Sequence, residues 1–178
     1  MSSRTTVLLV EDSPGDIRLT QESFRDLKGE TELHIAPDGP EALAFLRREG
    51  IHVGAPRPDL ILLDLNLPKM NGLEVLSQIK TDTSLRSIPT IILTTSNADT
   101  DVSMSYQLQA NCYLRKPEQW DDFEHLMRST LEFWLKRIKL PMARSDQAPT
   151  IGRLQRPASA PPAVPPPTEA LGKARNPT

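Results

Sequence analysis

The feature of this chain that most limits its fold is a regular alternation of short apolar segments with segments of helical spacing. Five apolar segments are expected to be strands, at residues 6–10, 32–36, 59–64, 89–94 and 111–115. Strands that alternate with helices through short links predict a parallel sheet covered by helices on both faces. Segment 59–64 is apolar throughout between its terminal acids, which is typical of a central strand. The chain is therefore expected to be an α/β protein.

The intervening segments carry helix-start signals. Ser13-Pro14-Gly15-Asp16 has the order of an N-cap, a proline in the first turn and an acid three residues after the cap. The helix that follows is expected to carry apolar Ile17, Leu19, Phe24 and Leu27. Further helices are predicted after Asp38, over about 73–80, over 100–109 and over 118–138.

The C-terminal residues differ in composition from the rest. Residues 141–178 contain nine of the 17 prolines and the run APPAVPPP. Such a segment has too little apolar surface to offset the entropy of ordering it. We expect a single domain at residues 1–140 and a proline-rich, disordered tail at 141–178. A tail of this kind cannot form a helix-turn-helix domain with its own core.

The composition excludes several classes of protein. A formal net charge of −2 gives no general attraction to nucleic acid or to an anionic membrane. No apolar run approaches the ~20 residues of a membrane span, and the N-terminal apolar stretch is short for a signal peptide. Cys112 is the only cysteine, so no internal disulfide can form. These features predict a cytoplasmic protein with neither nucleic acid nor membrane as partner.

Charged and hydroxyl side chains stand where the predicted strands end. Glu11 and Asp12 follow the first strand, Asp64 ends the third, Thr94 ends the fourth and Lys116 follows the fifth. In open α/β sheets, ligands bind beyond the carboxyl ends of the strands. Each of these residues could by itself be an ordinary cap or surface group. Their common position at one edge of the sheet indicates a functional site.

The chemistry of this set favours phosphoryl transfer. Two carboxylates about 4 Å apart repel by about 4 kcal/mol at an effective dielectric constant near 20, so they need a proton or a cation. A few hard oxygen ligands suit Mg²⁺. With a metal beside it, Asp64 could act as an in-line nucleophile, while Lys116 and the Thr94 hydroxyl hold phosphoryl oxygens.

The same residues lie in motifs that identify a family. The matches are VEDS at 10–13, LLDLNLPKMNG at 62–72, IILTTS at 91–96 and YLRKP at 113–117. In these motifs and their order, the whole of residues 1–140 resembles the receiver domain of two-component response regulators. The resemblance implies a doubly wound, flavodoxin-like sheet with strand order 2-1-3-4-5. It also implies phosphotransfer from a histidine kinase onto Asp64.

The resemblance assigns metal-binding roles to particular residues. Asp12 is expected to bind Mg²⁺ directly, and Glu11 largely through water. Asp64 would provide both a ligand and the phosphoacceptor oxygen. The backbone carbonyl of Asn66 would complete the protein ligands.

The resemblance also assigns the switch. Thr94 would be the switching hydroxyl, and Tyr113 the aromatic residue that moves inward with it. Lys116 would pair with the phosphoryl group, and its peptide bond to Pro117 is expected to be cis. Thr95 stands where many members carry a small alanine, so it is expected to narrow access to Asp64.

Two further expectations concern partners. YQLQANCYLRKP and LEFWLKRIKLP are similar to stand-alone receivers that partner bacterial and cyanobacterial phytochromes, so the kinase could be a bacteriophytochrome. Without a DNA-binding domain, the signal would leave through contacts with an unknown downstream protein.

The last predicted helix has one wide apolar face, made of Phe123, Leu126, Met127, Leu131, Trp134, Leu135 and Ile138. Phe133 widens this face, which favours a homodimer through the final helix and the Leu140-Pro141 extension over a fuller core.

Other functions remain open from the residues alone. A haloacid-dehalogenase-like phosphatase also uses an aspartate nucleophile, but it needs a second aspartate where Asn66 stands. A flavodoxin-like FMN carrier needs a phosphate-binding loop where this chain has the acidic EDSPGD. A pseudo-receiver would not keep the full set of acids. The leading interpretation is a phosphoacceptor signalling protein, and not an enzyme, with at most slow self-dephosphorylation.

Overall fold

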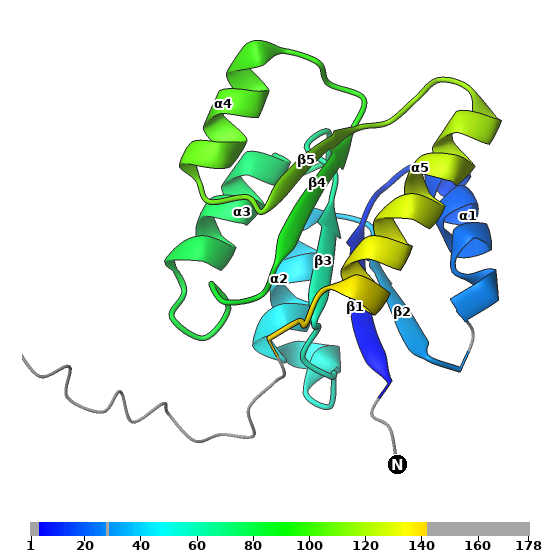
Figure 1. Cartoon of the computed structure of the whole chain (residues 1–178). Helices are drawn as coiled ribbons and strands as arrows, with labels where there is room; N and C mark the ends of the chain where they lie inside the picture. Colours follow the sequence, from blue (N-terminus) through cyan, green and yellow to red (C-terminus); the bar gives the residue numbers. More distant parts are fainter. Residues whose placement is uncertain (1–3, 28, 142–178) are drawn as a thin grey trace, which may run out of the picture. The chain divides into compact units, whose positions relative to one another are not determined.

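The computed structural model describes residues 4–27 and 29–141, and its centre is a five-stranded parallel sheet (Figure 1). The strand order is β2-β1-β3-β4-β5, which confirms the predicted fold class. Every strand end lies within one residue of its predicted position. The strands are β1 (Thr5–Val10), β2 (Thr31–Ala36), β3 (Leu60–Leu63), β4 (Thr90–Thr94) and β5 (Cys112–Arg115).

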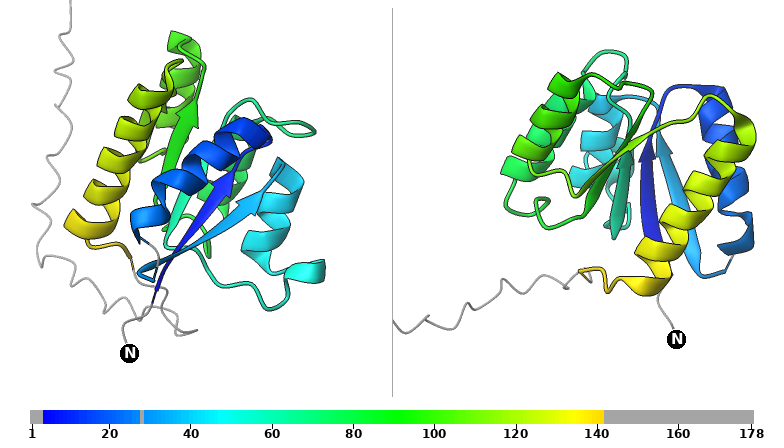
Figure 2. Two further views of the ribbon diagram at one scale, coloured as in Figure 1. Left: turned by 90° about the vertical axis from the view of Figure 1, so that its right-hand side faces the viewer. Right: turned by 45° about the horizontal axis from the view of Figure 1, so that its top comes forward.

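Helices cover both faces of the sheet, as expected for repeated βα units. Figure 2 shows α1 and α5 on one face and α2, α3 and α4 on the other. The α-helices are α1 (Pro14–Ser23), α2 (Gly39–Arg47), α3 (Gly72–Thr81), α4 (Asp99–Gln107) and α5 (Trp120–Glu132). Short 3₁₀ turns lie at η1 (Arg25–Leu27) and η2 (Gly50–His52), and a π-helical turn, η3 (Phe133–Arg137), extends α5.

The apolar residues of the central strand divide between two cores. Leu60 and Leu62 pack with residues of α1's end and α5, whereas Ile61 and Leu63 pack with residues of α2 and α3. All four side chains of β3 are fully buried. This burial on both faces is the reason for the continuous apolar run seen in the sequence. β3 ends with this buried run at Leu63, and Asp64 is the next residue.

The N-terminal capping signals are confirmed. The Ser13 hydroxyl accepts a hydrogen bond from the Asp16 amide at 3.3 Å, and Pro14 begins α1. The predicted first helix was too long, because α1 ends at Ser23. Phe24 follows as its C-cap and Leu27 lies in η1, and both are buried. The apolar spacing therefore identified two buried residues correctly, although a 3₁₀ turn replaces the end of the predicted helix.

The last helix begins and ends differently from the prediction of 118–138. α5 starts at Trp120, three residues after Pro117, and regular α-helical bonding stops at Glu132. Phe123, Met127 and Leu131 are buried against the sheet. The π-helical turn that follows has five-residue hydrogen bonding, which a 3.6-residue periodicity does not reveal.

One expectation about the backbone is wrong for this structure. No peptide bond within the described residues is cis, so the bond between Lys116 and Pro117 is trans. A trans X–Pro bond is intrinsically favoured by about 0.5–1 kcal/mol. The predicted disordered tail at 141–178 lies outside the described residues, apart from Pro141, and stays a prediction. Within the described part of the chain, no helix is long and apolar enough to cross a membrane.

Gly72 allows α3 to begin directly against the backbone of the Asp64 strand end. A Cβ atom at this position would lie 2.2 Å from the carbonyl oxygen of Asp64 and 2.6 Å from the Cα of Leu65. We expect Gly72→Ala to lower the free energy of unfolding by about 3 kcal/mol, because backbone atoms must shift to relieve the clash. Urea denaturation measures the change. Gly54→Ala is the matched control, since its Cβ would meet nothing within 4 Å. Equal midpoints for the two variants would contradict the close approach.

Candidate functional site

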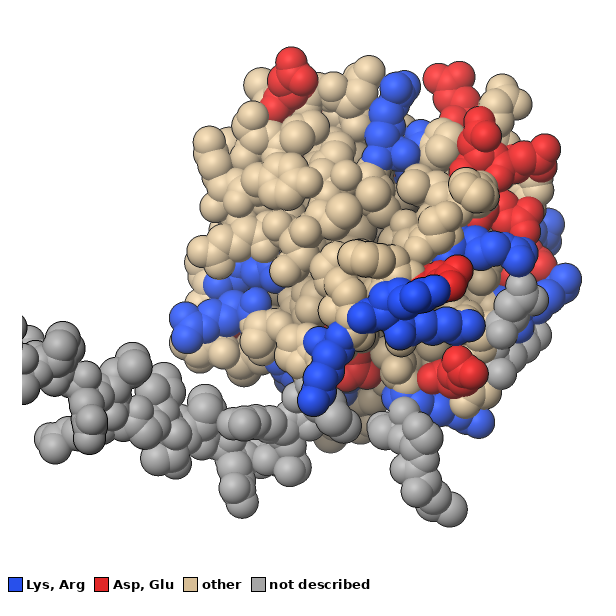
Figure 3. All heavy atoms as spheres, in the orientation of Figure 1, with Lys and Arg blue, Asp and Glu red and all other residues tan. Residues whose placement is uncertain are grey.

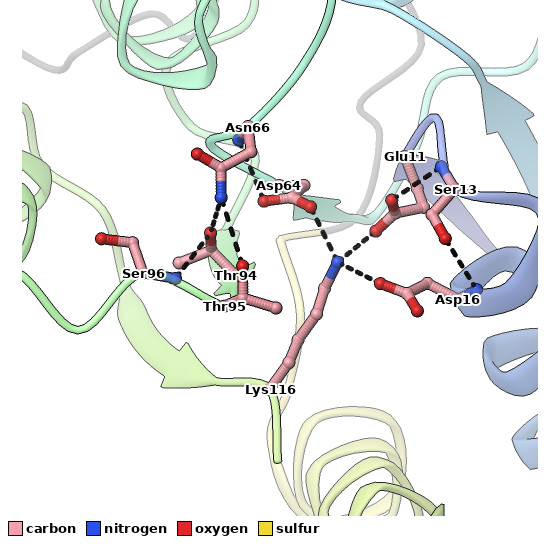
Figure 4. A network of polar contacts seen from close by, with 9 residues as sticks. All are labelled: Glu11, Ser13, Asp16, Asp64, Asn66, Thr94, Thr95, Ser96 and Lys116. Atoms are coloured by element: carbon pink, nitrogen blue, oxygen red, sulfur yellow. Dashed lines mark hydrogen bonds and ion pairs between the residues drawn. The ribbon is translucent and has the colours of Figure 1, made fainter. Parts of the chain in front are cut away.

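Most of the predicted site residues lie together at the carboxyl edge of the sheet, and Figure 4 shows Glu11, Asp64, Asn66, Thr94 and Lys116 there. Glu11 follows β1, Asp64 follows β3, Thr94 ends β4 and Lys116 follows β5. The Lys116 ammonium lies 2.7 Å from Oδ2 of Asp64, although 52 residues separate them in sequence. The strand topology therefore brings together the acid, the hydroxyl and the amine that the sequence placed at separate strand ends.

The Lys116 ammonium is the centre of the site. It donates to carboxylates of three residues: Glu11, Asp16 at 2.8 Å and Asp64 at 2.7 Å. The side chains of Lys116 and Glu11 are 3% and 2% exposed. Asp16 is 30% exposed and lies in the first turn of α1. Because an ammonium has three N–H groups, each carboxylate can accept one of them.

The buried charges shift one another's protonation. Burial raises the pKa of Glu11, despite the opposing charge of Lys116 and a hydrogen bond from the Ser13 amide. Burial acts in the same direction on Asp64, but the Lys116 charge and hydrogen bond outweigh it and lower the pKa of that carboxyl. Burial alone would lower the pKa of Lys116, but the surrounding carboxylates raise it above its ordinary value. The site therefore keeps an ionised Asp64 beside a charged ammonium.

The four residues predicted to hold a metal, Glu11, Asp12, Asp64 and Asn66, follow the ends of β1 and β3 at this edge of the sheet. Glu11 and Asp64 face the Lys116 ammonium, and Asp12 is exposed. Among the described residues, no group of three or more His, Cys, Asp or Glu side chains is placed to hold a metal ion. The Asn66 amide donates to Oδ1 of Asp64 at 3.1 Å, which sets its backbone next to the phosphoacceptor candidate.

The donor chemistry nevertheless fits a hard divalent cation. Three carboxylates share one ammonium, so the cluster keeps an excess of negative charge in a largely buried setting. The cost of that burial appears in the raised pKa of Glu11. Carboxylate and carbonyl oxygens are the ligands that Mg²⁺ and Mn²⁺ prefer.

Asn66 also links the ends of β3 and β4. Its side-chain amide donates to the hydroxyls of Thr94 and Thr95, both at 3.3 Å. Thr94 is fully buried, whereas Thr95 is exposed at the site. Asn66 thus holds the Thr94 hydroxyl near Asp64 through hydrogen bonds that do not involve Lys116.

Tyr113 and Thr94 are joined through Ser96, which the sequence analysis did not single out. The Tyr113 hydroxyl donates to the carbonyl oxygen of Ser96 at 3.0 Å. The Ser96 amide approaches the Thr94 hydroxyl at 3.4 Å, and its side chain donates to Asp101 in the first turn of α4 at 2.5 Å. This chain of contacts connects the site to the start of α4.

Asp16 is the main site residue that sequence reasoning missed. It was interpreted only as a helix-start acid, which is its most common role. The available signal was its position, since the first turn of α1 starts from the same sheet edge as Glu11 and Asp12. A cleft of about 160 Å³ reaches this point, and its lining includes Asp16, Thr95, Lys116, Trp120 and Phe123.

The comparison with known proteins agrees with this arrangement. Residues 7–128 match the family described as the response regulator receiver domain. The chain belongs to this family. It is 47% identical over 137 residues to the response regulator Rcp1 of Synechocystis sp., and the match covers 77% of this chain and 93% of Rcp1.

Solved structures of similar receivers confirm the fold. The phosphorylated cyanobacterial phytochrome response regulator RcpA has a TM-score of 0.76 and 44% identity, with 78% of this chain and 99% of that chain covered. The Mn²⁺-bound form of Rcp1 has a TM-score of 0.75 and 46% identity, with 77% and 99% covered. This receiver is therefore related to phytochrome response regulators, and one such relative is known with a bound divalent metal.

Proposed function

We propose that this receiver accepts a phosphoryl group on Asp64 from a histidine kinase, in a Mg²⁺-dependent reaction, and signals through protein contacts. The observation that carries the proposal is the position of the Asp64 carboxylate, 2.7 Å from the Lys116 ammonium and next to the buried Thr94 hydroxyl. A nucleophile, a fixed cation and a hydrogen-bond donor are the parts that phosphoryl transfer requires. In support, the related RcpA is known in a phosphorylated form.

In the proposed reaction an Asp64 oxygen attacks phosphorus, and a new O–P bond forms. The N–P bond of the donor phosphohistidine breaks, and its electron pair stays on the imidazole nitrogen. Lys116 and Thr94 then hold oxygens of the transferred group. Asp12, Asp64, the Asn66 carbonyl and, through water, Glu11 are the residues proposed to hold Mg²⁺, which supplies positive charge for the phosphoryl oxygens.

The proposed switch is the Thr94 hydroxyl together with Tyr113. In the structure Thr94 accepts from Asn66 and from the Ser96 amide. A phosphoryl group on Asp64 offers Thr94 a charged acceptor, which is a stronger partner than neutral groups. Ser96, Tyr113 and Asp101 then rearrange, and Tyr113 moves inward. The start of α4 thereby reports the state of Asp64.

The proposed kinase is a bacteriophytochrome or a related phytochrome. Support comes from relatives described as phytochrome or bacteriophytochrome response regulators, including AtBRR at 37% identity.

We propose a signalling role rather than catalysis, with slow self-dephosphorylation, because Asn66 stands where a phosphatase of the haloacid-dehalogenase type needs a second aspartate. The downstream partner is proposed to be a protein and not nucleic acid.

The direct test is incubation of the protein with a small phosphodonor and Mg²⁺, followed by Phos-tag electrophoresis. We expect one phosphate per chain, removed by hydroxylamine, which cleaves acyl phosphates. A label that survives hydroxylamine would contradict an aspartyl phosphate. Rapid turnover of a phosphate ester without any labelled protein would favour a phosphatase instead.

We further propose that two copies pair through α5, η3 and the Leu140-Pro141 extension. Of the wide apolar face, Phe123, Met127 and Leu131 are buried and Leu126, Trp134 and Leu135 are partly buried. Phe133, however, remains 53% exposed. Acids begin α5 at Asp121 and Asp122, and bases end η3 at Lys136 and Arg137. In Figure 3, basic side chains lie across the lower half of the face on which α5 ends in Figure 1, with acidic side chains among them. An antiparallel pair of these helices would place the acids of each copy beside the bases of the other, with Phe133 between the two charged ends.

Sedimentation velocity at micromolar concentration tests the dimer. We expect the unchanged protein to sediment as a dimer and Phe133→Glu as a monomer, because a buried charge without a partner opposes association. Ile51→Glu is the control, since Ile51 is an exposed apolar residue in η2, away from the proposed interface. A monomeric unchanged protein would contradict the proposal.

A further inference from the structure

Asp16 contributes the third carboxylate on Lys116, and it differs from the other two in origin and surroundings. Glu11 and Asp64 stand at strand ends and are buried, whereas Asp16 stands in α1 and is 30% exposed. A helix-start acid can satisfy the helix dipole while it faces solvent. The Asp16 carboxylate instead turns inward, 2.8 Å from the Lys116 ammonium, and lines the cleft beside it (Figure 4).

The three contacts are not equivalent during phosphoryl transfer. This step rests on the proposed function, in which Asp64 becomes an acyl phosphate and Glu11 takes part in holding a metal ion. Both groups then exchange part of their contact with Lys116 for new partners. Asp16 has no such task, so it is the carboxylate that can keep its contact with the ammonium throughout.

We propose that Asp16 is a positioning residue that holds the Lys116 ammonium toward Asp64 before and during phosphoryl transfer. Lys116 has a flexible four-carbon stem, and its effect on the phosphoryl group depends on where its charge is held. A charge fixed in place before reaction needs no reorganisation when the phosphoryl group arrives. Two carboxylates just after strand ends and one on a helix define the position of the ammonium from different directions.

The kinetic test compares Asp16→Asn with Glu118→Gln. Glu118 lines the same cleft and loses the same charge, but no hydrogen bond or ion pair joins it to Lys116 among the described residues. We expect Asp16→Asn to lower the maximal rate of phosphorylation by acetyl phosphate with Mg²⁺ about tenfold. The acetyl phosphate concentration for half-maximal rate should change little. Glu118→Gln should behave as the unchanged protein. Equal rates in all three proteins, or equal changes in both variants, would overturn the proposal.

A second measurement tests the contact in the metal-free, unphosphorylated protein. Lysine ammonium groups give observable proton–nitrogen NMR signals when burial and hydrogen bonds slow their exchange with water. We expect the Lys116 signal in the unchanged protein and in Glu118→Gln, and its loss or broadening in Asp16→Asn. If Asp16 only stabilises α1, the signal would persist and the proposal would fail. Should the unchanged protein take no phosphate at all, the proposed function fails, while this signal still decides whether Asp16 holds Lys116.

Discussion

Asp64→Asn is expected to abolish phosphorylation by a small phosphodonor, with a loss of at least about 1000-fold in rate. The amide nitrogen or oxygen of asparagine is a far weaker nucleophile than the carboxylate that Lys116 keeps ionised. The substitution hardly changes the size of the side chain. Lys116 keeps Glu11 and Asp16 as partners, so the buried ammonium is not left uncompensated. The measurement is hydroxylamine-sensitive label on Phos-tag gels with Mg²⁺ present.

The matched control for this variant is Asp59→Asn. Asp59 lies immediately before β3, whereas Asp64 lies just after it, and its carboxylate accepts a hydrogen bond from the Thr6 amide at 2.9 Å. An asparagine oxygen can accept the same bond, so the fold should persist. We expect Asp59→Asn to be labelled at the rate of the unchanged protein. Label on Asp64→Asn comparable to that of Asp59→Asn would show that the phosphate goes elsewhere.

The sheet edge was predictable because strand order and strand ends follow from simple patterns. The apolar run from Leu60 to Leu63 predicted a central strand, and burial on both faces confirms it. Once the strands were placed, Asp64 and Lys116 were expected at the same edge, since parallel strands end together. The structure shows them at that edge, with the ammonium 2.7 Å from the carboxylate.

Other features depended on side-chain direction, which residue patterns leave undefined. Asp16 was correctly placed in the first turn of a helix, but nothing in the sequence said that its carboxylate faces Lys116 rather than solvent. Glu11 was predicted as a metal ligand, yet in the described structure its nearest cation is the ammonium. The same carboxylates can interact with the ammonium or with a metal ion, because a nearby positive charge of either kind favours their ionised form.

Two details of the backbone were not predicted from the sequence, for a different reason. A π-helical turn begins at Phe133, and its residues Trp134 and Leu135 pack against the apolar cluster that includes Phe123 and Met127. The apolar spacing in the sequence does not distinguish α-helical from π-helical bonding. The trans bond before Pro117 depends on a small intrinsic energy difference that tertiary contacts can tip either way. Neither feature moves Lys116 away from Asp64.

Lys116→Met is expected to lower the free energy of unfolding by about 3 kcal/mol at neutral pH without divalent cations. Methionine has a similar length but removes the only cation that contacts Glu11, Asp16 and Asp64 within the described structure. Glu11 and Asp64 are buried, so they would keep their charges in a poorly solvated site. Urea denaturation measures the loss. Lys69→Met is the control, since Lys69 pairs with Asp38 but is itself 67% exposed, and its loss should destabilise the fold much less.

The loss of stability in Lys116→Met should depend on pH in a characteristic direction. In the unchanged protein the pKa of Lys116 is raised, so its stabilising contribution is present below the ordinary lysine pKa of 10.5 and disappears only as pH rises through the higher folded value. In Lys116→Met, Glu11 and Asp64 lose the cation whose charge and hydrogen bond act to lower their pKa values, so both pKa values are expected to rise. The folded variant then binds more protons than the unfolded chain, so its stability rises as pH falls from 7 toward 5. Added Mg²⁺ should restore part of the stability at pH 7, because a cation again compensates the carboxylates. A variant as stable as the unchanged protein at pH 7 without metal would contradict the charge balance assigned to this site.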